Sequence, residues 1–332
     1  MDYTAAYFLF LAKAVTVTVL ILVLVAGLAR LARSERRAGG RLEVRPLNRH
    51  YRRLAEALAE PQAPVRGWRE RWNRWRESRA REKGREARER GRPRVFVLDF
   101  DGDMRASAVE ALREEVSAVL LAAKPGDEVL LRLESGGGLV HAYGLAASQL
   151  ERLRAADVPL TVAVDKVAAS GGYMMACVGR RILAAPFAVL GSIGVVAQVP
   201  NLHRFLERRD IDFEQFTAGE YKRTVTVFGE NTPAAKAKFQ QELEAVHELF
   251  KGFVSRHRPQ LDLERVATGE AWLGEQAIEL GLVDELGTSD DFLLQRRDSH
   301  TLLALKYQPP RKPGRLPKAL LGRLWEWLNR AG

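Results

Sequence analysis

Strands and helices alternate along the middle of this sequence, and that alternation constrains its fold more than any other feature. Residues 95–100, "VFVLDF", form a short apolar segment typical of a strand, and residues 107–123 have the length and apolar spacing of a helix. The pattern repeats with a strand over 128–134 and a helix over 139–154, and a third strand covers 159–164. Alternation at this spacing predicts βαβ units, a mostly parallel sheet and an α/β fold.

Two later segments extend this domain. Residues 182–200 are apolar for long enough to resemble a membrane span, but Pro186, Gly191 and Gly194 divide them into short buried strands and turns. Residues 233–257 are rich in charge and predict one long helix.

An apolar segment near the start of the chain predicts a transmembrane anchor. Residues 5–29 are long enough to span a bilayer, and Lys13 lies near one end, where its long side chain reaches the interface. A cleaved signal peptide would carry a positive charge before the apolar run, whereas here Asp2 precedes it. We therefore expect a retained, single-pass anchor. The arginines that follow it place the rest of the chain in the cytoplasm by the positive-inside rule.

Charge divides the remaining chain into three parts. Residues 30–94 contain 22 Lys and Arg against 9 Asp and Glu, residues 95–305 contain 22 against 31, and residues 306–332 contain 7 against 1. Because the net charge of +10 belongs to the flanks, we expect no nucleic acid to bind the central domain. The expected parts are an anchor, a basic Arg/Trp-rich neck, a central domain and a basic amphipathic tail, at residues 1–30, 31–94, 95–300 and 301–332.

Aromatic residues in the neck and tail suggest contacts beyond the central domain. Trp68, Trp72 and Trp75 recur at helical spacing among arginines, which predicts one aromatic helical face. Such a helix suits a phospholipid membrane beside the anchor, a nucleic acid, or no partner at all if the neck is a solvated linker, and the sequence leaves these open. Residues 316–332 predict a short amphipathic helix that suits a membrane or a partner subunit.

Two glycine-rich turns are expected at one edge of the sheet, because each follows a strand and parallel sheets carry their sites at the carboxyl ends of strands. The first turn, residues 136–138, presents backbone N–H groups that suit a phosphate or a developing oxyanion. It matches neither a Walker loop nor GxGxxG, which weakens the phosphate interpretation and leaves purely structural glycines as an alternative. The second turn contains Ser170 and two glycines.

Ser170 has two interpretations, a helix cap or a nucleophile, and the glycines after it would let a substrate backbone approach. A serine nucleophile needs a base. Among the six histidines and the lysines, the sequence leaves His141 and Lys222 open, because Lys166 would lie about 13 Å from Ser170 along an extended segment. Cys177 falls in an apolar helix and is interpreted as a core residue.

Four segments, in this order and spacing, resemble the bacterial membrane serine peptidases of the signal peptide peptidase A family. They are "LRLESGGGLVHAYGLAASQL", "VDKVAASGGYMMACV", "GSIGVVAQVPN" and "TAGEYKRT". The resemblance extends over nearly the whole chain, including the anchor and neck. It implies a ClpP/crotonase-like fold of stacked ββα units and a serine–lysine catalytic pair, with no cofactor and no metal.

The resemblance implies a role for four residues. Ser170 matches the nucleophile, Lys222 the general base, Ser192 the serine that orients the lysine, and Gly137 the backbone donor to the oxyanion. Gly136 stands where the family usually has proline, so we expect a looser turn here. A lysine must be neutral to act as a base, although its ordinary pKa is about 10.4, and burial is what favours the neutral form.

The implied protein is a serine endopeptidase of the bacterial inner membrane that cleaves membrane-associated or unfolded polypeptides. Related peptidases take the serine and the lysine from neighbouring protomers or repeats. One copy of each residue here therefore implies a homo-oligomer that shares the dyad. Better-known family members face outward, opposite to the orientation that the arginines favour. The alternative is a crotonase-like binding or scaffold protein, whose glycine loop holds an acyl thioester or nothing, and which needs neither Ser170 nor Lys222.

Overall fold

The computed structural model describes residues 40–59 and 91–310, together with scattered positions before residue 85. The chain divides into two compact units, one of residues 44–306 and one of residues 1–43 with 307–332. Every element that carries a candidate site residue belongs to the unit of residues 44–306.

Several expectations for the flanks cannot be compared with the structure. The tail helix expected at 316–332 lies outside the described residues, and only isolated positions of the anchor and of the Trp-containing part of the neck are described. Among the residues that are described, no helix is both long enough and apolar enough to cross a bilayer.

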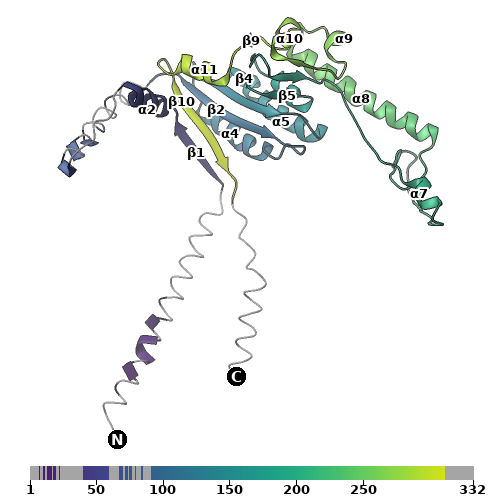
Figure 1. Ribbon diagram of the computed structural model, residues 1–332, viewed down its shortest axis with the longest axis horizontal. Helices are drawn as coiled ribbons and strands as arrows, with labels where there is room; N and C mark the ends of the chain where they lie inside the picture. Colours follow the sequence, from purple (N-terminus) through teal and green to yellow (C-terminus); the bar gives the residue numbers. More distant parts are fainter. Residues whose placement is uncertain are drawn as a thin grey trace. The chain divides into compact units, whose positions relative to one another are not determined.

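A mixed sheet with helices packed on it forms the centre of this α/β unit (Figure 1). The described strands are β1 (Arg41–Pro46), β2 (Arg94–Gly102), β3 (Glu128–Ser135), β4 (Leu160–Val164), β5 (Val167–Ala169), β6 (Arg181–Ala184), β7 (Val189–Gly191), β8 (Ala271–Leu273), β9 (Glu285–Leu286) and β10 (Thr301–Gln308). Their main order is β1-β10-β2-β3-β4-β6-β9, and the steps from β10 to β9 are parallel. A parallel sheet of this kind is what the alternation of strands and helices predicts.

Helices pack on both faces of the sheet because the side chains of each strand alternate between faces. The described helices are α2 (Asn48–Ala59), α4 (Val109–Ala122), α5 (Val140–Ala155), α6 (Gly171–Ala176), α7 (His203–Glu207), α8 (Pro233–His257), α9 (Leu263–Val266), α10 (Gly274–Glu279) and α11 (Ser289–Arg296). Val95 and Val97 of β2 pack in one cluster with Phe292 of α11. Phe100 points to the other face, where its ring meets that of Tyr143 of α5 edge-on.

The predicted elements of the central domain are present. Strands β2, β3 and β4 and helices α4 and α5 occupy the predicted segments, and α8 has the predicted bounds of residues 233–257. The apolar stretch 182–200 contains the short strands β6 and β7, as the proline and the glycines indicated.

The sheet extends past residue 300, where we expected the central domain to end. Thr301–Gln308 forms β10, which pairs in parallel with β2 through Leu302 and Val95. Part of the predicted neck is also folded, since residues 48–59 form α2. Asn48, at the start of α2, forms hydrogen bonds with the backbone in and just before β10. Its side-chain oxygen accepts from the N–H of Leu302 at 2.8 Å, and its amide donates to the carbonyls of Arg297 and His300.

The sheet forks at the carboxyl end of β3, and this fork positions the site. β3 pairs with β4 along Val129–Arg132, and then Ser135 pairs with Ala168 of β5. From there β5 pairs in parallel with β7, and β7 pairs antiparallel with β8. The ends of β3, β5 and β7 therefore lie side by side, each followed by a turn that carries a candidate residue.

Candidate active site

Ser170 lies in a strained turn between β5 and α6. Its backbone has a φ of 52° and a ψ of −118°, a region that serine rarely adopts. Such a conformation costs roughly 1–3 kcal/mol and persists only where neighbouring contacts impose it. Here the N–H of Ser170 donates to the carbonyl of Gly191 at 2.8 Å, and its carbonyl accepts from the N–H of Met174 at 3.0 Å. A strained strand-to-helix turn is also how hydrolase nucleophiles are presented.

The structure does not support the cap interpretation of Ser170. The side chain of Ser170 makes no capping hydrogen bond to α6, although the residue stands at the N-cap position. The helix does not use the hydroxyl, which leaves it available for chemistry.

The two glycines that follow Ser170 are required by the protein itself. A Cβ on Gly171 would collide with the ring of Tyr143, and one on Gly172 would lie 2.5 Å from the carbonyl oxygen of Ser135. The structure thus gives these glycines a packing role, and their role in letting a substrate backbone approach stays a prediction. They let α6 pack directly on α5 and β3.

The glycine turn after β3 meets Ser170, as the two turns at one sheet edge predicted. Gly137 has a φ of 88°, and a Cβ built on it would lie 2.7 Å from the Cβ of Ser170 and 2.8 Å from the backbone nitrogen of Gly171. Only glycine fits at such an approach. A Cβ on Gly136 would meet nothing within 4 Å, so the position that usually holds proline in the family has room for a side chain.

A buried hydrogen-bond chain lies behind this turn, and the sequence analysis did not anticipate it. The N–H of Gly137 donates to the Oγ of Ser135 at 3.1 Å, Ser135 bonds the hydroxyl of Tyr143 at 2.6 Å, and that hydroxyl donates to the carbonyl of Asp103 at 2.8 Å. The N–H of Gly137 is thus engaged in the single chain. The N–H of Gly171 lies in the first turn of α6, where no intrahelical acceptor exists, so it is a further candidate donor to an oxyanion.

Ser192 lies beside Ser170 at the end of the neighbouring strand. Ala169 pairs with Gly191 in the register of β5 and β7, so the serines that follow them occupy equivalent positions. Ser192 also has a positive φ, 49°, and its N–H donates to the carbonyl of Glu270 at 2.6 Å. The fold therefore brings together Ser170, Ser192 and Gly137.

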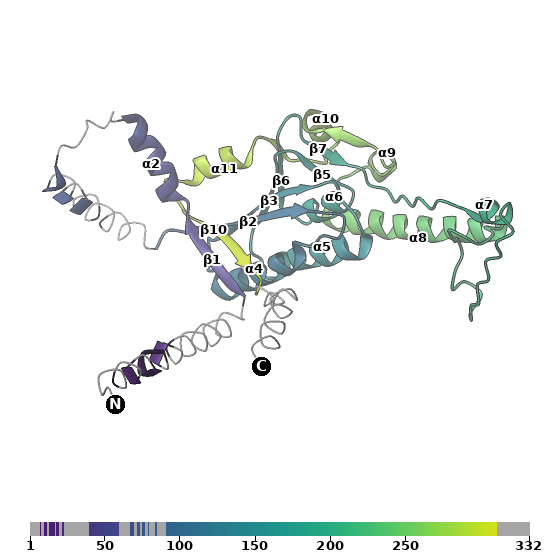
Figure 2. The same cartoon turned by 60° about the horizontal axis from the view of Figure 1, so that its bottom comes forward.

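Lys222 is not part of this group in the single chain. It is exposed and lies in the segment between α7 and α8. His247 of α8 contacts the carbonyl of Ile193, next to Ser192, but Pro233 at the start of α8 lies 14 residues earlier, roughly 21 Å along the helix axis. Figures 1 and 2 both show α7 at the end of α8 that is remote from the sheet.

In the described part of the chain, no hydrogen bond or ion pair joins the other titratable residues near the turns to Ser170. His141 is exposed in the first turn of α5. Lys166 pairs with Glu134, its Nζ lying 2.9 Å from one carboxylate oxygen, and this hydrogen bond raises the pKa of the lysine. Burial raises the pKa of the Cys177 thiol far above its usual range, so Cys177 is the core residue that the sequence predicted.

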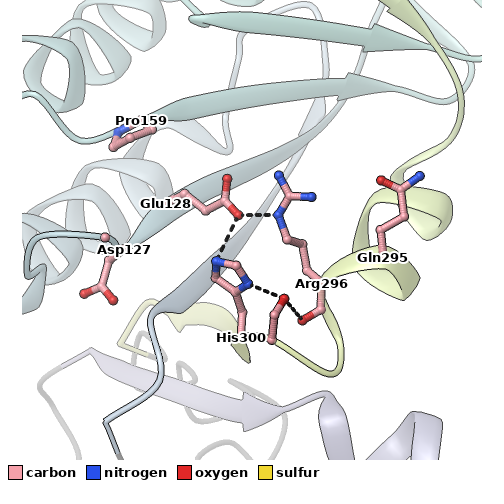
Figure 3. Close-up of a pocket in the computed structure, with 8 residues that line it drawn as sticks. Asp127, Glu128, Pro159, Gln295, Arg296 and His300 are labelled. Atoms are coloured by element: carbon pink, nitrogen blue, oxygen red, sulfur yellow. Dashed lines mark hydrogen bonds and ion pairs between the residues drawn. The ribbon is translucent and has the colours of Figure 1, made fainter.

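A pocket at the opposite end of the strands contains none of the expected site residues. Glu128, the first residue of β3, accepts from Arg296 at 2.8 Å and lies 3.7 Å from the ring of His300 (Figure 3). It is seven residues from Ser135, roughly 23 Å along a strand. The charges of Glu128 and Arg296 pair with each other, and this ion pair connects the end of α11 to the start of β3. We therefore assign these residues a structural role.

Comparisons with known proteins match the whole region that carries the site. Residues 2–150 match the N-terminal part of peptidase family S49, and residues 152–302 match peptidase family S49 itself. A protein of Buchnera aphidicola subsp. Baizongia pistaciae named "Putative protease SohB" is 42% identical over 312 residues, which cover 90% of this chain and 89% of that protein. The chain belongs to peptidase family S49.

A second curated relative agrees with this membership, and a solved structure aligns at much lower similarity. A "Probable protease SohB" of Haemophilus influenzae is 64% identical over 214 residues, which span 64% of this chain and 61% of that protein. Among solved structures, a serine-to-alanine mutant of the 1510-N membrane-bound stomatin-specific protease aligns with a TM-score of 0.39 and 12% identity, over 62% of this chain and 85% of that one. In this S49 chain, Ser170, Ser192 and Lys222 fall in the second family match and Gly137 in the first.

Proposed function

We propose that this S49 chain is a membrane-anchored serine endopeptidase with a ClpP/crotonase-like fold, in which Ser170 attacks a peptide carbonyl and Lys222 of a second copy acts as the base. The strained turn at Ser170, whose hydroxyl the following helix does not use, is the observation that carries the proposal. Membership of a peptidase family supports peptide hydrolysis as the reaction.

The proposed reaction proceeds in two steps. Lys222, in its neutral form, takes the proton of the Ser170 hydroxyl as its oxygen bonds to the substrate carbonyl carbon. The backbone N–H of Gly171 stabilises the oxyanion, and Lys222 then gives the proton to the leaving amine as the peptide bond breaks. The N–H of Gly137, the donor that the resemblance implies, already bonds Ser135 in the single chain. Water releases the acyl group from Ser170 by the same sequence. Ser192 orients the amine of the lysine.

The arm formed by α7, α8 and the segment between them supports the need for a second copy. Only Phe250 and Val254 of α8 are buried, so the residues from Pro233 to Leu249 pack on no core of their own. A helix of this kind is stabilised mainly by packing. The arm also exposes large apolar side chains, among them Phe205, Ile211 and Phe216 (88% exposed).

A second copy of the chain is the partner that would also complete the dyad. Lys222 is exposed in the single chain, whereas a lysine base needs burial to become neutral. An interface that covers the arm would bury apolar surface and the lysine together.

The first test is hydrolysis of a fluorogenic peptide by the detergent-purified full chain. Ser170→Ala and Lys222→Ala should each lower turnover roughly 10³-fold or more. Lys166→Ala removes another exposed lysine and should leave turnover within about twofold, because Lys166 pairs with Glu134. If both site variants cleave as fast as the parent, the dyad is wrong and the crotonase-like alternative gains support.

A mixing experiment tests whether the dyad is shared between copies. Ser170→Ala still carries the lysine and Lys222→Ala still carries the serine, so a mixed oligomer contains some complete sites. With random assembly, about a quarter of the sites should be complete. Recovery of activity on mixing supports a shared dyad, and no recovery in co-purified mixed oligomers contradicts it.

Anchoring in the bacterial inner membrane remains part of the proposal. It is supported by the apolar segment 5–29, and the basic neck favours the cytoplasmic side. Protease treatment of sealed inverted vesicles tests the orientation, since digestion of the neck places it in the cytoplasm and protection places it outside.

A further inference from the structure

The chain of hydroxyl groups behind the glycine turn is fully buried. Tyr143 is 0% exposed and Ser135 is 2% exposed, and both are bonded on each side. A buried polar network of this kind holds its members in one arrangement when every group is satisfied.

The direction of the three hydrogen bonds follows from the groups involved. The carbonyl of Asp103 can only accept, so the single proton of Tyr143 points to it. Ser135 must then donate its proton to the oxygen of Tyr143, and its lone pairs accept the N–H of Gly137. The order is therefore Gly137 to Ser135 to Tyr143 to Asp103, and it has one consistent proton arrangement.

This hydrogen-bond chain from Gly137 to Asp103, called the relay below, ends at a residue that other hydrogen bonds hold in place. The carboxylate of Asp103 accepts from the N–H groups of Arg105 and Ser107 and from the Ser107 hydroxyl, which closes a tight turn. The next residue, Met104, accepts the N–H of Leu139 at 2.9 Å. The 103–107 turn thus holds the glycine turn at both ends, through Ser135 and Tyr143 on one side and through Leu139 on the other.

We propose that Ser135 and Tyr143 are positioning residues that hold the turn of residues 136–138 against Ser170 for attack on the peptide. The inference rests on the proposed peptidase function. Three consecutive glycines leave this backbone freer than other residues would. The hydrogen-bond chain restrains the turn that packs against Ser170 and against the backbone nitrogen of Gly171, and oxyanion donors act through being held in place before the reaction.

The main test is Tyr143→Phe in the full chain, with kinetics on a fluorogenic peptide. Without the hydroxyl, the turn is no longer tied to Asp103. We expect kcat to fall roughly 10- to 100-fold, since small displacements of reacting groups have effects of this size, while KM stays within about twofold. The affinity for a peptide boronic acid, whose adduct with Ser170 places an oxygen at the oxyanion position, should weaken by a similar factor.

Tyr173→Phe is the matched control. Tyr173 is equally buried, and its hydroxyl donates to the carbonyl of Leu282 at 3.0 Å, away from the glycine turn. Tyr143→Phe removes two buried hydrogen bonds and Tyr173→Phe removes one, so both variants should lower Tm, but Tyr173→Phe should leave kcat within about twofold.

Ser135→Ala provides a second variant, should Tyr143→Phe fail to fold. It should lower kcat as well, and the double variant should lose no more than the worse single one, because both changes break the same relay. The inference is overturned if Tyr143→Phe lowers only Tm, if its effect falls on KM instead of kcat, or if Ser135→Ala cleaves faster than the parent. These results presuppose a parent that cleaves and a Ser170→Ala variant that does not, and a failure of that comparison refutes the proposed function instead.

Discussion

Gly137→Ala tests the close approach on which the site geometry depends. The added Cβ would lie 2.7 Å from the Cβ of Ser170 and 2.9 Å from the carbonyl oxygen of Ala169. Carbon atoms pack at about 3.5–4.0 Å, so the turn and Ser170 must separate by roughly 1 Å. A misplacement of that size lowers catalytic rates by roughly 100-fold.

The same substitution also strains the backbone. Gly137 has a φ of 88°, where a residue with a Cβ is disfavoured by roughly 1–3 kcal/mol. For a unit of this size, about 1 kcal/mol corresponds to roughly 2–4 °C in Tm, so Tm should fall by roughly 2–12 °C.

Gly136→Ala is the control in the adjacent position. Its Cβ would meet nothing within 4 Å, and its φ lies outside the left-handed region. Replacing a glycine by alanine at a compatible site stabilises by about 0.4–1 kcal/mol, so Gly136→Ala should keep kcat and should raise Tm slightly. Peptide hydrolysis and thermal unfolding measure both variants. If Gly137→Ala retains kcat within twofold of the parent, the packing of this turn on Ser170 is not what positions the site.

Three further predictions concern stability and reactivity. Cys177 should resist thiol reagents until the chain unfolds, because it is buried and burial raises the pKa of its thiol. Asp284→Asn should destabilise the unit by about 3 kcal/mol in denaturant unfolding, since it leaves the buried guanidinium of Arg258 without its charge partner at 2.8 Å, and a loss below about 1 kcal/mol would contradict this. Hydrogen bonds from the N–H and hydroxyl of Ser107 lower the pKa of Asp103, so this group stabilises the folded chain above about pH 4 and less as the pH falls through its folded pKa. The Tm advantage of the parent over Asp103→Asn should therefore shrink below about pH 4, and an advantage that grows there would refute the assignment.

The regular part of the fold was predictable because its elements are local. Each strand from β2 to β4 is a short apolar run, and α8 is bounded by the N-cap Thr232, whose hydroxyl accepts from Ala235, and by Arg258. β10 was missed because its pairing with β2 joins Leu302 to Val95, more than two hundred residues apart, and such partners leave no local pattern. The neck helix α2 was missed for a similar reason, since Asn48 is fixed by the backbone around β10.

The sequence analysis missed the hydrogen-bond chain of Ser135 and Tyr143, because neither residue shows a functional pattern when it is taken alone. Tyr143 has the spacing of a core residue in α5, and Ser135 is simply the last residue of β3. One signal was available, since a hydroxyl that ends a strand immediately before three glycines is placed to bond the turn. Its partner Tyr143 becomes visible only once α5 packs beside β3.

Two strained serines lie at neighbouring strand ends, and the proposed dyad also needs a lysine that the single chain does not bring to them. Ser170 and Ser192 both have a φ near 50°, and together they store roughly 2–6 kcal/mol in backbone conformations that glycine would adopt without this cost. Neither conformation is needed to continue β5 or β7, which end one residue earlier. Strain of this kind persists where the surrounding packing imposes it and where function retains it. The Ser170 side of the proposed dyad is therefore held in place by the sheet. The lysine stands on an arm with little core of its own, so assembly of copies is the step that would bring the two together.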